Sequence, residues 1–495
     1  MNSRRYIFVL AMTFFTLSSL PLSLSAQNTA EHKPKHHQYK LYDIGTLGGP
    51  NTTTVAVIPG VSNNGTVIGG SNTSTPGVTH AFQWRRGVLT DLGALPGANN
   101  FSYSFMSNGR GDIDGESENG LIDPATGYPE VHSVRWRNGQ ILDLGTFGGT
   151  QSTPSAINNR GQIVGWALND IPDPLSTGFW GVGLQDGFPG TTQTRAFVWQ
   201  DGKLTDLGTL GGPDAKAYGI NQRGQIVGNS YIDSNINSTT GIPTVHPFLW
   251  DKGQMIDLGS LGGTISWAWW VNESGQVLGR STLAGDQADQ GFVWERGVMT
   301  ELSLGGSYGN VLWNNNAGDV VGWSSLSDFS LPFDAFLWSH GQLRDIGTLP
   351  GTDCAFPWAI NASKQVVGQA GLSCSNTLAF LWEDSGPMVD LNTLVEPASD
   401  VTLFIAVYIN DPGQILAEGT LPNGDTHTFL LVPDGNCDDA CEARIAAKQN
   451  AAAIPRSAAT SNLPLVRGLG PNGRLNPLPN GLGHGLIDLP PAERR

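Results

Sequence analysis

Histidine and aspartate recur along this chain in fixed contexts, so metal binding is the first chemistry to consider. Four repeats place a histidine just before an AFxW-type run: His80, His132, His246 and His427. Imidazoles are common metal ligands, and a ring of them would suggest a metal centre. The other four repeats carry Arg195, Gln290, Asp334 and Leu378 at this place. Because half of the repeats lack the histidine, loop packing is favoured over metal binding, and we expect no metal site.

An acidic residue also recurs, as the first residue of each DLG-type run. These residues are Asp43, Asp91, Asp143, Asp206, Asp257, Glu301, Asp345 and Asp390. A carboxylate there can accept backbone N–H groups of the glycine loop that follows. Calcium binding is the alternative, but the further oxygen ligands that calcium prefers are missing. The intervals of 48, 52, 63, 51, 44, 44 and 45 residues lie near those of propeller blades.

Other motifs give no catalytic residue and no cofactor. Residues 110–112 read Arg-Gly-Asp and residues 112–116 read Asp-Ile-Asp-Gly-Glu, but alignment with 158–165 makes the Arg-Gly pair an ordinary turn. GxSxG, HExxH and phosphate-loop motifs are absent. Residues 468–473 match a dinucleotide fingerprint, yet no strand precedes them. The acids that propeller hydrolases need near the axis are missing from the expected innermost strands.

Each repeat contains four runs of strand type. In the third repeat they are 155–158, 161–165, 196–199 and 203–208. An NxxG turn joins the first run to the second, and pairs such as Asp-Gly at 201–202 join the third to the fourth. Asparagine bonds its own backbone and glycine accepts positive φ, so both joints predict short hairpins. The turn asparagines are Asn108, Asn158, Asn221, Asn272, Asn315, Asn361 and Asn410, with Ser62 in the first repeat.

The two ends of the repeat region are complementary halves of one repeat. The region begins with a lone fourth strand at 40–45 and finishes with a third strand at 429–432. The first strand can therefore complete the last sheet, which closes a ring and removes two exposed edges. We predict an all-β, eight-bladed propeller of four-stranded antiparallel blades; a seven-bladed propeller and a β-solenoid are the alternatives.

Composition and the chain ends suggest an exported protein. Residues 1–26 resemble a signal peptide, with two arginines before a short apolar run, and 27–38 form a polar leader. The propeller is assigned to 39–433, a short helical or disulfide-bearing linker to 434–454, and a disordered tail to 455–495. No other segment is apolar enough to enter a membrane, and we expect a secreted or periplasmic monomer.

Charge and cysteines limit the partners. Residues 41–433 hold 15 basic and 36 acidic residues, and the sequence shows no Lys/Arg track that could follow a phosphate backbone. Nucleic acid is therefore not expected.

Four cysteines in an exported chain suggest disulfides. We expect Cys354 to pair with Cys374, whereas Cys437 and Cys441 could pair with each other, pair between chains or stay free.

The order of the motifs resembles a known family. AFxW, often after histidine, then DLGTLGG, AxxIN and GQxVG recur in register over about residues 40–432. This pattern is similar to the bacterial "probable extracellular repeat, HAF family". The resemblance implies an exported repeat array without an established activity or catalytic residues. The second repeat departs most, with HSVRW at 132–136 and no TLGG after Asp91.

Aromatic residues that do not recur are the candidate ligand contacts. The AFxW aromatics recur in nearly every repeat, so we expect them to fill the space between blades. In contrast, the connection between the second and third strands of the third repeat is the longest, and it holds aromatics without repeat counterparts. The candidates on this loop are Phe179, Trp180 and Phe188, and those on the innermost strands are Trp267, Trp269, Trp270, Trp313 and Trp358. Blade packing is the alternative role, favoured for the innermost-strand group.

These observations predict a non-enzymatic propeller that binds a glycan or a cell-envelope protein through one loop face. Two alternatives stay open. One is a carbohydrate-active hydrolase or lyase that uses acids on loops the repeat comparison cannot align. The other is a structural surface protein that assembles with itself.

Overall fold

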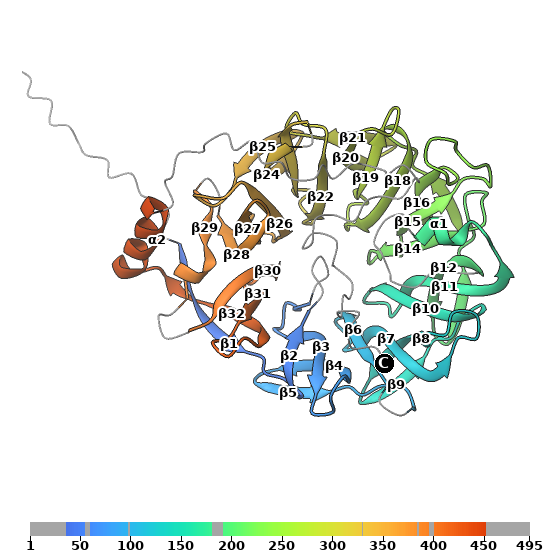
Figure 1. Cartoon of the computed structure of the whole chain (residues 1–495), viewed down its shortest axis with the longest axis horizontal. Coiled ribbons are helices and arrows are strands. Elements are labelled where there is room, and N and C mark those ends of the chain that lie inside the picture. The colour runs from blue at the N-terminus through green and yellow to red at the C-terminus, as the bar shows by residue number, and fades with distance from the viewer. Residues whose placement is uncertain are drawn as a thin grey trace, which may run out of the picture. The chain divides into compact units, whose positions relative to one another are not determined.

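The computed structural model describes residues 36–54, 60–97, 100–180, 192–328, 330–383, 386–395 and 400–451, which form a ring of eight blades (Figure 1). Each blade is a four-stranded antiparallel sheet, and the eight-bladed propeller predicted from the repeat is confirmed. Single parallel bridges, Val245 with Ile265 and Phe333 with Cys354, join two pairs of neighbouring blades.

The strands are given from the innermost to the outermost in each blade. Blades 1 and 2 contain β2 (Gly48–Thr53), β3 (Val67–Thr73), β4 (Thr79–Arg85) and β5 (Val88–Asp91), then β6 (Ser102–Ser107), β7 (Ile113–Ile122), β8 (Pro129–Arg137) and β9 (Gln140–Asp143). Blades 3 and 4 contain β10 (Gly148–Ile157), β11 (Ile163–Pro172), β12 (Thr192–Gln200) and β13 (Lys203–Asp206), then β14 (Ala215–Ile220), β15 (Ile226–Tyr231), β16 (Val245–Asp251) and β17 (Gln254–Asp257).

Blades 5 and 6 contain β18 (Gly262–Val271), β19 (Val277–Leu283), β20 (Asp289–Glu295) and β21 (Val298–Leu302), then β22 (Gly309–Asn314), β23 (Val320–Ser327), β24 (Ser330–Ser339) and β25 (Gln342–Gly347). Blades 7 and 8 contain β26 (Cys354–Ile360), β27 (Val366–Leu372), β28 (Ser375–Trp382) and β29 (Val389–Asp390), then β30 (Thr402–Ile409), β31 (Ile415–Thr420), β32 (Thr426–Asn436) and β1 (His37–Asp43). Short helices are α1 (Ser176–Trp180), α2 (Asp439–Ala451) and the 3₁₀ turn Leu391–Thr393.

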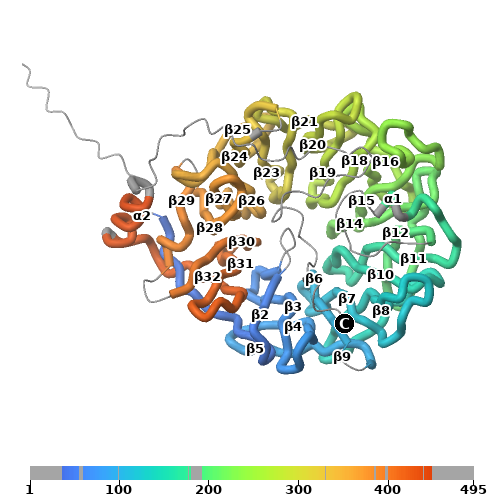
Figure 2. The backbone as a smooth tube through the Cα atoms, in the orientation of Figure 1, coloured from blue at the N-terminus to red at the C-terminus, as the bar shows by residue number. Residues whose placement is uncertain are grey.

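The N-terminal strand closes the ring as predicted. β1 pairs antiparallel with β32 and becomes the outermost strand of blade 8 (Figure 2). Asn410 in blade 8 then donates a hydrogen bond of 3.0 Å to the Ser62 carbonyl in blade 1. Because first and last segments share one sheet, neither leaves an unpaired edge at the seam.

The AFxW phenylalanines form the core, as predicted. Those of seven blades are at most 1% exposed: Phe82, Phe197, Phe248, Phe292, Phe336, Phe380 and Phe429. The last glycine of GQxVG makes room for them. A Cβ on Gly228 would overlap both the Lys216 carbonyl oxygen and the Phe248 ring, so the second strand passes close to its neighbours only with glycine there.

A ring of asparagine side chains connects the blades at one end. In these turns the asparagine Oδ1 accepts the backbone N–H four residues on, and in five of the seven blades it also accepts the N–H two residues on, as from Gln225 and Arg223 to Asn221. The Nδ2 group also donates to the equivalent carbonyl of the next blade, 3.0 Å away between Asn221 and Asn272. Seven such bonds of 3.0–3.1 Å, the asparagine ladder, link all eight blades. Sequence reasoning foresaw the local cap but missed the bond between blades.

The connections divide the propeller into two faces. The turns between first and second strands and between third and fourth strands are short, and we call this end the turn face. The connections between second and third strands, and between successive blades, lie at the other end, the loop face. The loop face carries the length variation: the second to third strand connection spans 32 residues from Gly165 to Phe197 but 13 from Gly69 to Phe82.

The C-terminal helix α2 is fixed to the ring. Cys437 and Cys441 form a disulfide at its start, and both are fully buried. Ile445 packs into the same core cluster as Leu391 and Leu394, beside blade 7. Lys448 pairs with Asp390 at 3.2 Å.

Candidate functional site

The recurring histidines are bound to the recurring aspartates of their own blades. Nδ1 of the histidine lies 2.8–2.9 Å from an aspartate oxygen on the adjacent outermost strand. The pairs are His80–Asp91, His132–Asp143, His246–Asp257 and His427–Asp43. In blade 3, Arg195 Nε takes the same place, 2.9 Å from Asp206. Each carboxylate also accepts an N–H from the glycine two residues on, as Gly259 donates to Asp257. The motif is a cross-strand staple.

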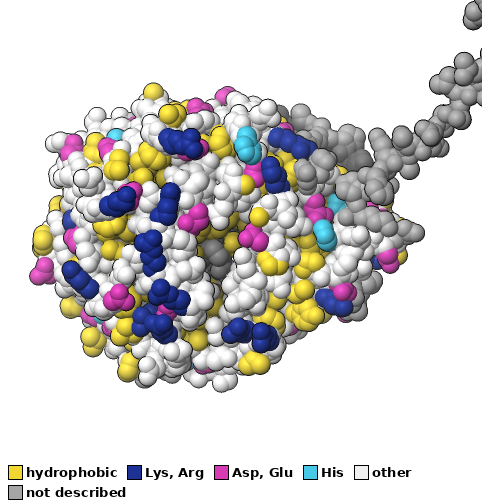
Figure 3. All heavy atoms as spheres, turned by 180° about the vertical axis from the view of Figure 1, so that it is seen from behind, with side chains coloured by type: hydrophobic (Ala, Val, Ile, Leu, Met, Phe, Trp, Pro, Cys, Tyr) yellow, Lys and Arg dark blue, Asp and Glu magenta, His cyan; other side chains and the backbone are white. Residues whose placement is uncertain are grey.

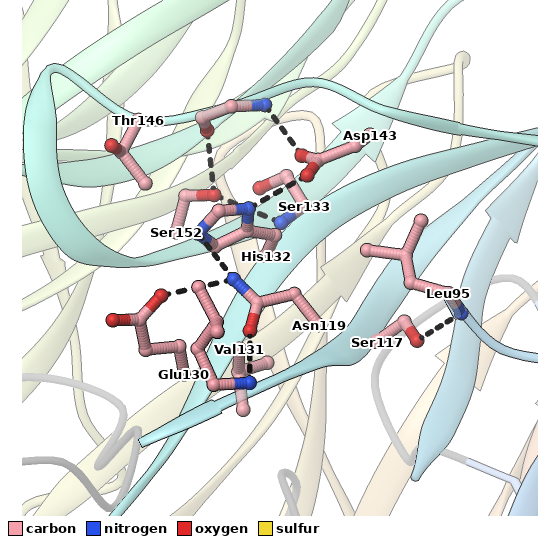
Figure 4. Close-up of polar contacts among 12 residues, drawn as sticks. Leu95, Ser117, Asn119, Glu130, Val131, His132, Ser133, Asp143, Thr146 and Ser152 are labelled. Atoms are coloured by element: carbon pink, nitrogen blue, oxygen red, sulfur yellow. Dashed lines mark hydrogen bonds and ion pairs between the residues drawn. The ribbon is translucent and has the colours of Figure 1, made fainter. Parts of the chain in front are cut away.

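The blade 2 staple has the most polar surroundings (Figure 4). His132 Nδ1 points to Asp143, and Asn119 Nδ2 lies 3.4 Å from His132 Nε2 on its other side. Asn119 Nδ2 is also 3.0 Å from Glu130 Oε2. With Nδ1 donating to Asp143, Nε2 accepts from Asn119. Both ring nitrogens are engaged, so the imidazole presents no free nitrogen as a general base.

Two of the staples lower the pKa of their carboxylates. Burial alone would raise the pKa of Asp257, but hydrogen bonds from His246 and the Gly259 N–H outweigh burial and lower it. The pKa of Asp143 is lowered in the same way by His132 and Gly145. These aspartates therefore stay ionised over the ordinary pH range. Within the described residues, no group of three or more His, Cys, Asp or Glu could hold a metal ion.

The innermost-strand aromatics are used in packing. Trp267, Trp313 and Trp358 are between 5% and 8% exposed, and Trp269 and Trp270 are half-buried. The Trp270 ring packs on Trp313 with centroids 4.2 Å apart, across blades 5 and 6. Trp313 meets Tyr408 edge-on at 5.6 Å. Packing, the alternative role considered from the sequence, therefore accounts for Trp267, Trp313 and Trp358, whereas Trp269 and Trp270 stay partly exposed.

The first aromatic side chain of the long blade 3 loop points inward. Phe179 is fully buried and packs on Tyr231 of blade 4, with centroids 4.7 Å apart. It cannot meet a partner on the surface, so its assignment as a ligand contact is corrected. The burial has a local cause, because the short helix α1 turns the chain back against β15 and β16. Phe188 and the side chain of Trp180 lie outside the described residues.

A set of buried or partly buried charged side chains was missed from the sequence. It comprises Glu116, Arg280 and Glu418, which stand at the same place in the second strands of their blades, directly after Gly115, Gly279 and Ala417. Glu116 Oε2 lies 3.2 Å from Thr153 Oγ1, and Glu418 Oε1 accepts the Thr54 N–H at 2.9 Å, each across a blade boundary. Burial raises the pKa of Glu418 to about 7, against the opposing effect of the Thr54 hydrogen bond. The signal in the sequence was that this position varies between repeats, whereas the nearby asparagine turn recurs.

A buried carboxyl pair lies at the base of the blade 3 loop. Asp214 is fully buried and accepts the Thr194 N–H at 2.7 Å. Burial, supported by the neighbouring Asp173, raises the pKa of Asp214 to about 8, against the opposing Thr194 hydrogen bond. Lys216, also fully buried, lies 5.4 Å from the Trp166 ring centroid. These groups join blades 3 and 4 beneath the surface.

The surface of the loop face carries exposed apolar side chains. Twelve large hydrophobic residues are exposed among the described residues, and seven lie at the loop-face ends of second strands or in the connections that follow them. They are Leu121, Ile122, Tyr128, Ile171, Ile236, Leu326 and Leu372. Leu121, Ile236 and Leu372 are 60–63% exposed on blades 2, 4 and 7. An apolar tip on five of the eight blades is the strongest candidate for a contact surface.

A disulfide supports this face in blade 7. Cys354 and Cys374 are bonded, with Cα atoms 5.2 Å apart, as expected from their common face. The bond ties the start of β26 to the connection that directly follows Leu372.

Among the described residues, no helix has the length and apolar character to span a membrane.

Comparisons with known proteins give no match in sequence and only weak likenesses to solved structures. No family model matches, and no curated protein matches. The solved structures include TolB from Acinetobacter baumannii, at 9% identity and a TM-score of 0.29, covering 75% of this chain and 81% of that one. A puromycin hydrolase has 11% identity and a TM-score of 0.37, with 76% and 59% covered. The Aleuria aurantia lectin has 10% identity and a TM-score of 0.26, with 57% and 92% covered.

Proposed function

We propose that this chain is an exported binding module that holds a protein partner on its loop face. The observation that carries the proposal is the row of exposed apolar tips on blades 2, 3, 4, 6 and 7. Each tip extends from a rigid strand pair, as Leu121 and Ile122 end β7. Rigid sheets with variable apolar tips are suited to recognition, because little order is lost on binding.

The chemistry of the tips favours a protein over a glycan. Sugars bind best on flat aromatic faces, and the aromatic candidates Trp267, Trp313 and Trp358 are buried. Six of the seven tip residues are aliphatic, and aliphatic side chains suit the apolar patches of another protein. The two disulfides are typical of an oxidising compartment, which fits export and a cell-envelope partner.

The test changes the tips without changing the ring. The variant L121D/I122D places two charges on the blade 2 tip. The control V88D/V298D places two charges at residues that are each 63% exposed on the outermost strands, away from the loop face. The full chain and both variants would capture partners from cell-envelope extract. Proteins retained by the wild type would be identified and titrated individually with each variant.

We expect one defined protein whose affinity falls by roughly tenfold or more in the tip variant and stays unchanged in the control. Equal loss in both variants, or retention by both, would overturn the assignment of the loop face. Binding that is lost only when glycan is removed from the extract would favour the glycan alternative.

A further inference from the structure

The basic residues of this acidic chain gather on the turn face. Of the 15 in residues 41–433, twelve lie at the short turns or in the strand residues beside them. Those at turns between third and fourth strands are Arg85, Arg86, Arg135, Arg137, Lys203, Lys252, Arg296 and Arg344. Those at turns between first and second strands are Arg110, Arg160, Arg223 and Lys364. Figure 3 views this face, and Lys and Arg side chains are concentrated over one half of it.

Three of these arginines form a row with a spacing of one blade. Arg110, Arg160 and Arg223 occupy the same position in the turns of blades 2, 3 and 4, and all three are exposed. Arg110 Nη1 donates to the Arg160 carbonyl at 3.0 Å, so each side chain leans over the next blade. Arg160 Nη1 lies beside Gly224, and Arg223 lies beside Gly275, in the same way. The ring thus brings together charges that are about 50 residues apart in sequence.

The charge is confined to part of the face. At the turns of blades 1–4, nine basic residues stand beside four acids, Asp112, Asp114, Asp201 and Asp251. Asp112 and Asp114 are buried, and Arg137 Nε lies 3.2 Å from Asp112. The turn face of blades 5–8 carries three basic residues, Arg296, Arg344 and Lys364, against the acids Glu273, Glu295, Asp319, Glu383, Asp411 and Asp434. We call the turn face of blades 1–4 the basic arc.

We propose that the basic arc binds a linear acidic polysaccharide. Guanidinium groups recognise carboxylate and sulfate groups by paired hydrogen bonds, and a row of them suits a chain of repeating anions. Exposed aromatic side chains on which bases could stack are missing from the described part of this arc, since the two exposed tyrosines, Tyr42 and Tyr128, lie elsewhere. An anionic membrane would also meet the acids of blades 5–8, whereas a linear chain can follow the arc alone.

The experiment measures binding of the full chain to polygalacturonate, a linear polyuronate, by titration calorimetry at several salt concentrations. The triple variant R110Q/R160Q/R223Q removes the row. The control K40Q/R296Q/R344Q removes the same charge outside the arc. Lys40 and Arg296 form exposed ion pairs with Asp434 and Glu295, so their loss changes folding little. Thermal unfolding and circular dichroism would verify that every variant is folded.

We expect polygalacturonate binding that weakens as salt rises, that falls roughly tenfold or more in the row variant, and that is unchanged in the control. The neutral polymer dextran should not bind. Absence of polygalacturonate binding, or equal weakening in both variants, would overturn the proposal. Tighter binding to double-stranded DNA or to phosphatidylglycerol vesicles than to polygalacturonate would overturn it in favour of those partners. The row lies on the turn face and the apolar tips lie on the loop face. Neither result of this experiment therefore decides whether the proposed protein contact exists.

Discussion

The two faces of the propeller are built by different chemistry from the same repeat. On the turn face, neutral amides repeat in register, and each asparagine performs the same two tasks in seven blades. Toward the loop face, charged groups have a different kind of partner in each case. Glu116 and Glu418 bond across a blade boundary to Thr153 and Thr54, and Arg280 bonds to Asp289 of its own blade. The repeated asparagine bonds on the turn face therefore maintain the ring. The charged contacts toward the loop face differ between blades, which allows individual loops to change. Four predictions test this difference.

The largest effect is expected at the asparagine ladder. Asn221→Ala would leave the Arg223 and Gln225 N–H groups without their acceptor and would remove the bond to the Asn272 carbonyl. The side chain is 2% exposed, so we expect a loss of about 3 kcal/mol in the free energy of unfolding. Chemical denaturation measures this, with the exposed loop residue Asn235→Ala as a control that changes stability by less than about 0.5 kcal/mol.

Blade 1 offers the reverse experiment on the same ladder. Ser62 stands where seven blades have asparagine, and its side chain bonds only within its own turn. Ser62→Asn supplies a donor for the Asn108 carbonyl, and we expect a gain of about 1 kcal/mol. A loss of stability in this variant would show that the ladder is not transferable between blades.

The second effect concerns the buried acids toward the loop face. The pKa of Glu418 is raised from 4.5 to about 7, so the folded state prefers its protonated form. Its contribution to stability is fully present below pH 4.5 and is lost as the pH rises through 7. Glu418→Gln keeps an oxygen for the Thr54 N–H and removes the ionisation. We expect the variant to be about 2 kcal/mol more stable than the wild type at pH 8 and similar at pH 5.

Thermal unfolding across this pH range is the measurement. Glu273→Gln on the turn face is the control, and its stability relative to the wild type should not change in the same pH window. If Glu418→Gln showed the same difference at pH 5 and pH 8, the carboxyl would not be the source of the pH dependence.

The smallest effect is expected at the histidine–aspartate staples. The pKa of Asp257 is lowered, so its contribution to stability is present above its ordinary value of 3.8 and is lost as the pH falls below that value. The pair is partly exposed, with Asp257 at 46%, and solvent screening reduces its worth to about 0.5 kcal/mol. Asp257→Asn should cost that amount at pH 6 and nothing at pH 2.5. A cost above about 2 kcal/mol in urea titrations would mean that the staple supports more than its own blade.

Several features of the fold could be predicted from the sequence because they depend on residues close together in the chain. The hairpins follow from the Asn–Gly spacing, the core from Phe and Trp on one strand face, and the closed ring from the split last repeat. The Cys354–Cys374 bond followed from the shared face of its two connections. In each case the deciding contact lies within one repeat or at its two ends.

The candidate site depended on contacts that the local sequence does not contain. Phe179 was a candidate surface contact, but α1 directs it onto Tyr231, about 50 residues away in the next blade. The exposed tips and the basic arc arise in the same way, since Arg110, Arg160 and Arg223 are neighbours only in the closed ring. The sequence by itself determined the repeat, its turns and its closure, because hydrogen bonding and strand alternation act locally. Only the tertiary structure decided which side chains face solvent, because burial depends on the neighbouring blade.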